Sequence, residues 1–439
     1  MPNIRYRRAL IVLISLLSLP FMSYGKNLTL VYSGNVDGEL EPCGCSAEGD
    51  FGGIRRQVTA IDALRKRHPN LALISTGGWI GGFSAHEKLT GDFILKAVAA
   101  IGYDAVGVQW SDLSYGTEFI TPHSISWVAT NWRSREFLPV KRFRRNDQDM
   151  AFFSWLDPEQ SPFKHLADRQ EDSNVTKMVE ALRAAKRDKV LTLVSTTLPL
   201  PEAQRLLPME LIDILFVRAA YEKFAVPQRQ GKTVVLQPGS RGMRLGQLDF
   251  SLAADGSIGE FQHQVIDLPK TVADSPRMED WYTDYNERVK AAFVEETKLR
   301  KAQASGDSEY MGEQVCQACH VEQYSIWQQS RHSQALESLR RVNKTFDPDC
   351  IACHTVGFRA PGGYIDDEVT AHLTNVQCES CHGPGRAHVA SNGATKISVK
   401  SAAKGQVCAQ CHNQKHSPAF DFERYWPKIA HGRSVSIKK

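Results

Sequence analysis

The chain lacks a strong excess of charge of either sign and, after its first residues, any long hydrophobic run. Its 53 lysine and arginine residues nearly balance 49 aspartate and glutamate residues, for a net charge of +4, so we expect no nucleic-acid partner. No stretch beyond residue 25 is apolar for long enough to span a bilayer, so the mature chain is expected to have no transmembrane span. Hydrophobic residues still make up 42% of the sequence, which is enough for packed cores and argues against a disordered chain.

The first 25 residues have the pattern of a signal peptide. Arg5, Arg7 and Arg8 form a positive segment, the apolar run Ala9–Met22 follows, and small residues precede a cleavage point after Gly25. An uncleaved membrane anchor is the alternative, but the run is short for a membrane span. We therefore expect export to the periplasm or the cell exterior.

Cysteine is scarce in most of the chain and abundant near its end. Only Cys43 and Cys45 lie outside the stretch from Cys316 to Cys411, which holds the other eight cysteines. These eight form four C-x-x-C-H frames, the attachment signature of c-type haem. Two thiols at this spacing reach the two vinyl groups of one porphyrin, and the adjacent histidine lies under the iron. The four frames are formed by Cys316, Cys319 and His320; Cys350, Cys353 and His354; Cys378, Cys381 and His382; and Cys408, Cys411 and His412.

Paired cysteines also build zinc sites and disulfide scaffolds. A zinc ribbon does not need a histidine directly after every pair, and a disulfide scaffold does not need one either. The four frames therefore predict four covalently bound c-type haems within residues 309–439. In so short a stretch we expect the haems to pack against one another and to pass electrons.

Histidine is the expected second axial ligand of these haems. The usual strong distal ligands are methionine and histidine, and Met311 is the only methionine after Met278. A single histidine outside the frames would usually be a surface or structural residue. Because four iron positions lie nearby, we expect about three of the five such histidines to be ligands. Haems with two histidine ligands and low potentials are predicted. The histidines outside the four frames are His332, His372, His388, His416 and His431.

This region resembles the cytochrome c554 family of tetrahaem electron carriers over residues 310–431. Beyond the haem frames, the resemblance is carried by Glu322-Gln323-Tyr324, Trp327, Ser330-Arg331-His332, Gly362-Gly363-Tyr364, Leu373-Thr374-Asn375-Val376 and Gly383-Pro384-Gly385-Arg386. Small domains of this kind consist mostly of helices and loops, and the periodicity of residues 321–341 predicts one helix that projects His332 inward.

The resemblance also implies distal ligands. In that family three haems have two histidine ligands and one iron is five-coordinate. By position, His332 corresponds to the distal ligand of the third haem, His388 to that of the fourth and His431 to that of the first. The second haem, on His354, would then be five-coordinate. Two histidines have no counterpart, and either could cap that iron: His372 and His416.

Residues 26–267 alternate between apolar runs and segments of helical periodicity, which predicts an α/β domain. Residues 279–304 are charged and helix-prone, so we expect residues 268–308 to be a linker helix and joint before a haem domain at 309–439. Helices are expected at 54–67 and 93–101, and strands at 28–32, 71–75, 105–108, 190–194, 212–217, 233–236 and 245–252.

The order of these elements resembles the N-terminal domain of 5′-nucleotidases and related metallophosphoesterases. That family holds two metal ions with aspartate, histidine and asparagine side chains. The matching stretches are Tyr32–Gly38, Gly52–Arg56, Leu73–Gly78, Gly102–Val106 and Tyr115-Gly116. At the family's ligand positions this chain has Asn35-Val36-Asp37, Gly78, Gln109-Trp110-Ser111-Asp112, a residue near Thr196 and residues near 218–221. We therefore expect a domain that keeps the fold without the metals and without hydrolase activity.

The sequence favours an exported electron-transfer protein with redox partner proteins, either other cytochromes or a quinol-linked complex. The alternatives are a haem oxidoreductase acting at a five-coordinate iron and a nucleotidase with an attached cytochrome. The Cys43-Gly44-Cys45 segment has either a redox or metal role or a merely structural one, because a disulfide across a single residue is strained.

Overall fold

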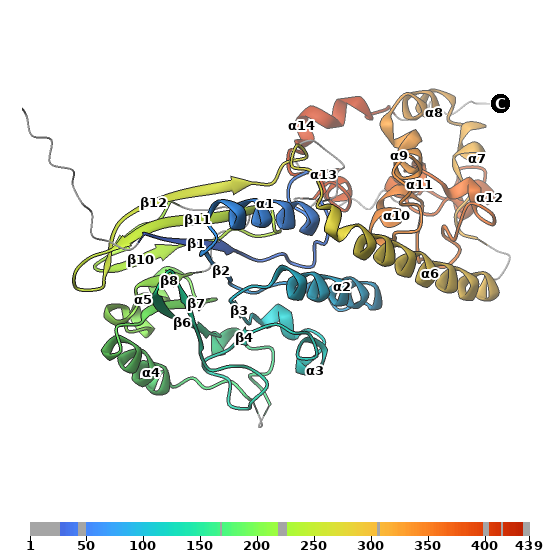
Figure 1. The fold of residues 1–439 in the computed structure, drawn as a ribbon. Helices are drawn as coiled ribbons and strands as arrows, with labels where there is room; N and C mark the ends of the chain where they lie inside the picture. Colours follow the sequence, from blue (N-terminus) through green and yellow to red (C-terminus); the bar gives the residue numbers. More distant parts are fainter. Residues whose placement is uncertain are drawn as a thin grey trace, which may run out of the picture.

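The computed structural model describes residues 27–42, 50–166, 169–217, 226–304, 308–397, 404–413 and 416–432. The expected signal peptide, Cys43 and Cys45 lie outside these described residues. An α/β region forms the N-terminal part of the molecule, and a region of short helices and loops follows from residue 308 (Figure 1).

The α/β region contains two six-stranded sheets. In spatial order the first comprises β12 (Ile258–Asp267), β11 (Arg244–Leu252), β1 (Asn27–Ser33), β2 (Ala72–Ser75), β3 (Ala105–Gly107) and β4 (Trp127–Val128). The second comprises β5 (Lys141–Arg145), β6 (Gln148–Trp155), β7 (Leu191–Thr196), β8 (Ile214–Phe216), β10 (Thr233–Leu236) and β9 (Gln228–Gln230). Strands β1 to β4 run parallel to one another, as do β6, β7, β8 and β10, whereas β11, β12, β5 and β9 pair antiparallel with their neighbours.

The two sheets pack face to face, and helices cover their outer faces (Figure 1). Side chains alternate between the two faces of a strand. On β1, Leu30 and Tyr32 enter the core between the sheets, while Val31 packs under the helices. On β6, Phe152 enters the core between the sheets, while Phe153 packs under the helices on the outer face. The helices of this region are α1 (Ile54–Arg67), α2 (Ala85–Ile101), α3 (Thr117–Ile120), α4 (Thr176–Arg187), α5 (Leu200–Leu206) and α6 (Glu279–Gln303).

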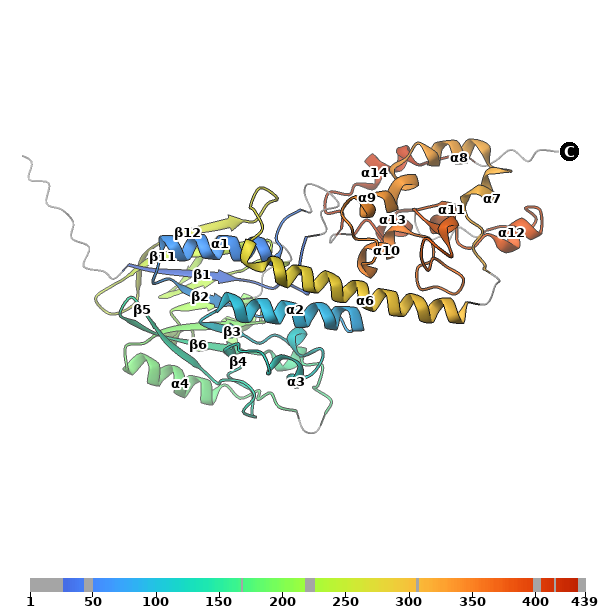
Figure 2. The ribbon, with the colours of Figure 1, turned by 45° about the vertical axis from the view of Figure 1, so that its right-hand side comes forward.

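Helix α6 joins the two regions (Figure 2). Near its start, Tyr285 is buried and meets Phe93 of α2 edge to face, with ring centroids 5.5 Å apart. Near its end, the Arg300 guanidinium donates to the carbonyl oxygen of Tyr364 at 2.7 Å. The predicted linker helix is therefore present, and it packs on both regions along its length.

The C-terminal region is built from helices of at most two turns. They are α7 (Glu313–Gln317), α8 (Val321–Gln328), α9 (Ala335–Arg341), α10 (Pro348–His354), α11 (Cys378–His382), α12 (Arg386–Ala390), α13 (Lys404–Ala409) and α14 (Phe422–Tyr425). The apolar cluster of this region has four buried members: Ile351, Val356, Tyr364 and Leu373. So small a cluster gives little hydrophobic stabilisation to about a hundred residues.

Short 3₁₀ segments complete the fold. They span Trp110–Leu113, Pro158–Gln160, Met209–Leu211, Pro276–Met278, Arg331–Gln334, Ala371–Leu373 and Trp426–Lys428. Among the described residues, no helix is both long and apolar enough to cross a bilayer.

The predicted α/β fold is confirmed, and α1 coincides with the helix expected at 54–67. Helix α2 begins eight residues before the predicted start, at a capping box in which Ser84 and Glu87 bond to each other's backbone. The prediction of one helix over 321–341 is wrong. At Ser330 the backbone is extended, the Ser330 hydroxyl donates to the Trp327 carbonyl oxygen at 2.6 Å, and a 3₁₀ segment separates α8 from α9. A local side-chain bond of this kind competes with the helix.

Candidate functional site

Each C-x-x-C-H frame lies on a single helical turn, in or directly after α7, α10, α11 and α13. The amide N–H of His320 donates to the Cys316 carbonyl oxygen at 3.0 Å, and that of His412 donates to Cys408 at 2.8 Å. Residues three apart on a helical turn face the same side, so each turn presents its two thiols together. Among the described residues, none of the eight cysteines of these frames forms a disulfide.

Three histidines of the frames face a second imidazole at nearly the same separation. The pairs, with their ring-centroid separations, are His320 with His388 at 6.0 Å, His412 with His332 at 6.1 Å, and His382 with His431 at 5.8 Å. The three pairs thus share one ring separation, although they join different segments of the chain.

This separation fits an iron ion between two imidazoles. A metal–imidazole bond is about 2 Å long, so two nitrogens on opposite sides of one metal lie about 4 Å apart. The centre of each ring lies about 1 Å further out, which places the two centres about 6 Å apart. The ring separations of the three pairs therefore match the separation expected for two imidazoles on one iron.

The histidine pairs in the structure differ from the ligand pairs that the family resemblance implied. The expected partners of His332, His388 and His431 were the haems on His382, His412 and His320 respectively, and the structure pairs all three differently. Contacts between distant segments explain the change. The Arg386 amide donates to the Glu309 carbonyl oxygen at 3.1 Å, which holds α12 beside α7, and the Gln323 side chain of α8 donates to the Gly432 carbonyl oxygen at 3.2 Å.

The fourth frame is different, because His354 faces no second imidazole among the described residues. Its Nδ1 lies 2.6 Å from the Ala335 carbonyl oxygen and 3.4 Å from the Ser338 hydroxyl. A bond at Nδ1 fixes the ring and leaves Nε2 for a metal.

The two unassigned histidines lie elsewhere in the described structure. His372 packs against Gly312, where a Cβ would lie 3.3 Å from its ring carbon. The amide of His416 donates to the Asn413 side-chain oxygen at 3.0 Å.

Burial keeps the histidines of the frames in their metal-binding form. Removal from water lowers the pKa of His320, His354, His382 and His412, and it lowers that of the facing His332 as well. A lowered pKa favours the neutral imidazole, whose free nitrogen lone pair can bind a metal.

Thiols of different frames lie next to one another. The Cys378 thiol raises the pKa of its neighbour Cys316, and the Cys353 thiol raises that of Cys411. Cys408 has the same effect on Cys381, where burial contributes most. Porphyrins attached to these cysteines would therefore be neighbours.

A second polar cluster lies where β1, β2 and β3 end, the usual ligand-binding edge of a parallel sheet. The Asn35 side-chain oxygen accepts from Gln109 Nε2 at 2.8 Å, and its Nδ2 donates to Asp37 at 3.3 Å. Gln109 Nε2 also donates to the Thr76 carbonyl oxygen at 3.0 Å. These amides bond to each other and to the backbone at the positions where the family resemblance expects metal ligands.

Gly78 is fixed by the same cluster. Its φ is +77°, and a Cβ at this position would lie only 2.7 Å from Asn35 Cγ. An aspartate here would collide with Asn35, so the side chains present do not fit the family's metal-bridging ligand.

Asp112 has a structural role that the sequence did not predict. Its fully buried carboxylate accepts from the amides of Gly78 at 2.8 Å, Trp79 at 2.7 Å and Gln109 at 2.9 Å. Burial raises its pKa to about 6, against the opposing effect of these backbone donors. The carboxylate therefore joins the loops after β2 and β3. No pattern in the sequence distinguishes this structural aspartate from an aspartate that binds a metal.

Comparison with known proteins confirms the resemblance of the C-terminal region. The family model "Cytochrome c554 and c-prime" matches residues 315–383, and "Cytochrome c7 and related cytochrome c" matches residues 365–425. Cytochrome c-554 of Nitrosomonas europaea is 36% identical over 146 residues, which cover 26% of this chain and 62% of that protein. The match thus spans less than two thirds of that relative. The similarity of this region to these families implies covalently bound haem.

The N-terminal region is similar to phosphoesterases in fold. A sulfate thiohydrolase of Thermus thermophilus matches with a TM-score of 0.51 at 14% identity, over 60% of each chain. A 5′-nucleotidase precursor of the same species has a TM-score of 0.49 at 15% identity and covers 60% of this chain and 59% of its own. A calcineurin-like phosphoesterase of Bacillus subtilis, also at 0.49 and 15%, covers 60% of this chain and 98% of its own. The sulfate thiohydrolase match shows that this region shares the fold of the corresponding part of that protein.

Proposed function

We propose that this chain is an exported tetrahaem c-type cytochrome that transfers electrons. The observation that carries the proposal is the set of three facing imidazole pairs, 5.8 to 6.1 Å apart, each with one histidine from a C-x-x-C-H frame. Each bound haem would supply a reversible one-electron couple. The ligand pairs of the proposal are His320 with His388, His382 with His431, and His412 with His332.

The haem on His354 is proposed to be five-coordinate. Its Nδ1 bond to Ala335 supports a fixed proximal ring, and no described imidazole faces it. An open iron position would bind a small ligand, and this favours a second candidate function, reduction of a small molecule at that haem.

Neighbouring thiols support an order for the haems. Cys316 adjoins Cys378 and Cys411 adjoins Cys353, and Cys381 lies within electrostatic range of both Cys408 and Cys411. Because thiols attach at the porphyrin edge, the haems would follow one another as first, third, fourth and second. The proposed electron path runs along this series, with the five-coordinate haem at one end.

The N-terminal region is proposed to have no hydrolase activity and to serve in docking. The amide bonding of Asn35 to Gln109 and the crowding at Gly78 support the loss of the two-metal site. The proposed division is a signal peptide at 1–25, the phosphoesterase-type domain at 26–267, the connecting helix at 268–308 and the haem domain at 309–439. The proposed location is the periplasm or the cell exterior, and the proposed partners are other cytochromes or a quinol-linked complex.

The test is a haem count combined with carbon monoxide binding. In the full chain made with c-type haem maturation, we expect an intact mass of residues 26–439 plus four haems and carbon monoxide binding at one reduced haem. His332→Ala should open a second iron, so binding should rise from one to two molecules per chain. The control His372→Ala should leave it at one. A haem count below four, or no rise in His332→Ala, would contradict the proposal.

A further inference from the structure

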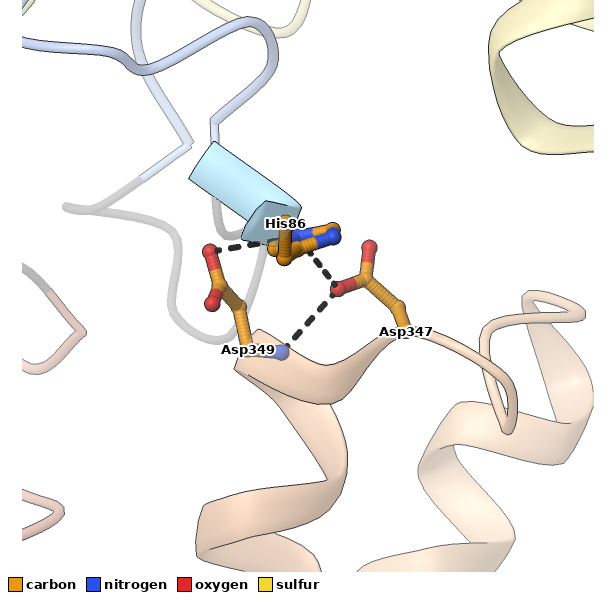
Figure 3. A group of neighbouring side chains, drawn as sticks. All are labelled: His86, Asp347 and Asp349. Carbon is orange, nitrogen blue, oxygen red and sulfur yellow. Dashed lines mark hydrogen bonds and ion pairs between the residues drawn. The ribbon is translucent and has the colours of Figure 1, made fainter. Parts of the chain in front are cut away.

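The boundary between the two regions contains a cluster of three metal-ligating side chains. His86 lies in the first turn of α2, whereas Asp347 and Asp349 lie at the start of α10 (Figure 3). One ligand atom from each lies within 4.8 Å of the other two, and within the described residues no other group of three or more such side chains has this arrangement. The chain therefore brings a histidine and two carboxylates together from segments about 260 residues apart.

The three side chains point to one place but do not hydrogen-bond across it. His86 Nε2 lies 3.7 Å from Asp347 Oδ1 and 3.8 Å from Asp349 Oδ2. Both distances are too long for a hydrogen bond, and the His86 ring has no hydrogen-bond partner in the part of the chain that the structure describes. The side chains of His86 and Asp347 are only 9% and 8% exposed. The nearly buried imidazole therefore faces both carboxylates at ion-pairing distance, and metal-ligating side chains gathered at this spacing can share one cation.

The separations fit a metal ion. Two sides of the triangle of ligand atoms are 3.7 and 3.8 Å, and the third is at most 4.8 Å. An ion equidistant from the three atoms lies about 2.1 to 2.4 Å from each, close to the length of a zinc–nitrogen or zinc–carboxylate bond. Calcium and magnesium prefer oxygen ligands alone, so the imidazole selects an ion of the zinc type.

The nearest lysine does not neutralise the carboxylates of the cluster on the side that faces His86. Lys344 Nζ is 3.8 Å from the other Asp347 oxygen, but it forms its close contacts with Glu41 and with Asn286, the latter at 2.8 Å. Asp347 Oδ1 also accepts the Asp349 amide at 3.1 Å, which orients the carboxylate towards His86. Lys344 therefore leaves both carboxylates of the cluster without a close positive partner on the His86 side.

We propose that His86, Asp347 and Asp349 bind one divalent cation of the zinc type, which joins the two regions. The fourth ligand would be water, since Asp349 is 55% exposed and the site opens to solvent on its side. Asp349 directly precedes Cys350, so the cation would fix the start of the second haem-attachment helix on the N-terminal region.

Zinc titration of the haem-loaded full chain tests this proposal. After treatment with a chelator, zinc is added and the bound metal is counted by mass spectrometry beside the haem iron, with affinity from calorimetry. We expect one zinc per chain, at micromolar affinity or tighter. Hydrogen exchange in α10 and in the first turn of α2 should slow when zinc is added.

Two variants and one control assign the ligands. His86→Ala should abolish zinc binding. Asp349→Asn, at a half-exposed position that does not cap α10, should weaken it at least 10-fold. The control is His123→Ala, because His123 faces the single carboxylate Asp92 at 3.4 Å and should not matter. No bound zinc in the wild-type chain, or equal affinity in Asp349→Asn, overturns the proposal. The haem count, measured on the same sample, tests the cytochrome function separately.

Discussion

The two regions of this molecule are stabilised in opposite ways. The N-terminal region buries its apolar side chains in three large clusters, two of them under helices and one between the sheets. The C-terminal region has an apolar cluster of four buried side chains and helices of at most two turns. Short helices are marginal on their own, so the second region depends on something other than its own hydrophobic core.

Their polar side chains differ in the same sense. At the end of the N-terminal sheet, Asn35, Gln109 and Asp112 are satisfied by one another and by the backbone. In the C-terminal region, histidine rings face each other in pairs with centroids about 6 Å apart, the separation expected for two imidazoles on one iron. Metal binding to such ligands contributes to folding, so the proposed haems would stabilise this region in a way that the N-terminal sheet does not require.

The largest expected effect comes from withholding haem. A chain made without haem attachment should lose the C-terminal region as a folded unit, because its four-residue apolar cluster cannot offset the conformational entropy of ordering it. Limited proteolysis should then cleave throughout residues 309–432, while residues 50–300 stay protected. If the haem-free C-terminal region resisted proteolysis, its stability would not depend on haem, and the two regions would not be stabilised in opposite ways.

A smaller effect, confined to the N-terminal region, is expected from Asp112→Ala. The change leaves backbone amides without their buried acceptor and should lower the free energy of unfolding of that region by about 4 kcal/mol. The haem spectrum should not change. Asp188→Ala is the control, since that carboxylate is 62% exposed, and its effect should stay within about 0.5 kcal/mol. Thermal unfolding followed in the far ultraviolet measures both.

The smallest effect is expected where the regions meet. Lys344 is 11% exposed and contacts Glu41 of the N-terminal region, so Lys344→Met leaves the partly buried Glu41 carboxylate with the Tyr282 hydroxyl but no positive charge beside it. We expect a loss of about 2 kcal/mol in docking, less than for a fully buried pair because Glu41 is 30% exposed.

Hydrogen exchange in α10 and the second half of α6 is the measurement for this change. Lys232→Met is the matched control, since Lys232 is 72% exposed and pairs with the exposed Asp255 at 2.7 Å within the N-terminal region. Equal exchange in both variants would mean that the two regions are held together by α6 alone.

The sequence predicted much of the fold and the types of residue at the candidate sites. The expected strands at 28–32 and 71–75 and the helix at 54–67 are present, because each buries a face whose period is visible in the sequence. The edge hairpin of β5 and β6 was not predicted, since its first strand, Lys141–Arg145, is almost wholly charged. The break at Ser330 was missed because a single hydroxyl bond to Trp327 decides it.

The sequence by itself determined the local chemistry, because thioether attachment and strand burial depend on residues close together in the chain. The spacing of the C-x-x-C-H frames and the alternation of apolar residues are of this kind. Only the tertiary structure decided which histidine faces which, as His388 with His320 and His332 with His412. It also decided that His86 meets Asp347 across the boundary. Such pairs depend on contacts between segments far apart in the chain, such as the two hydrogen bonds from Arg386 to the carbonyl oxygens of Ser308 and Glu309.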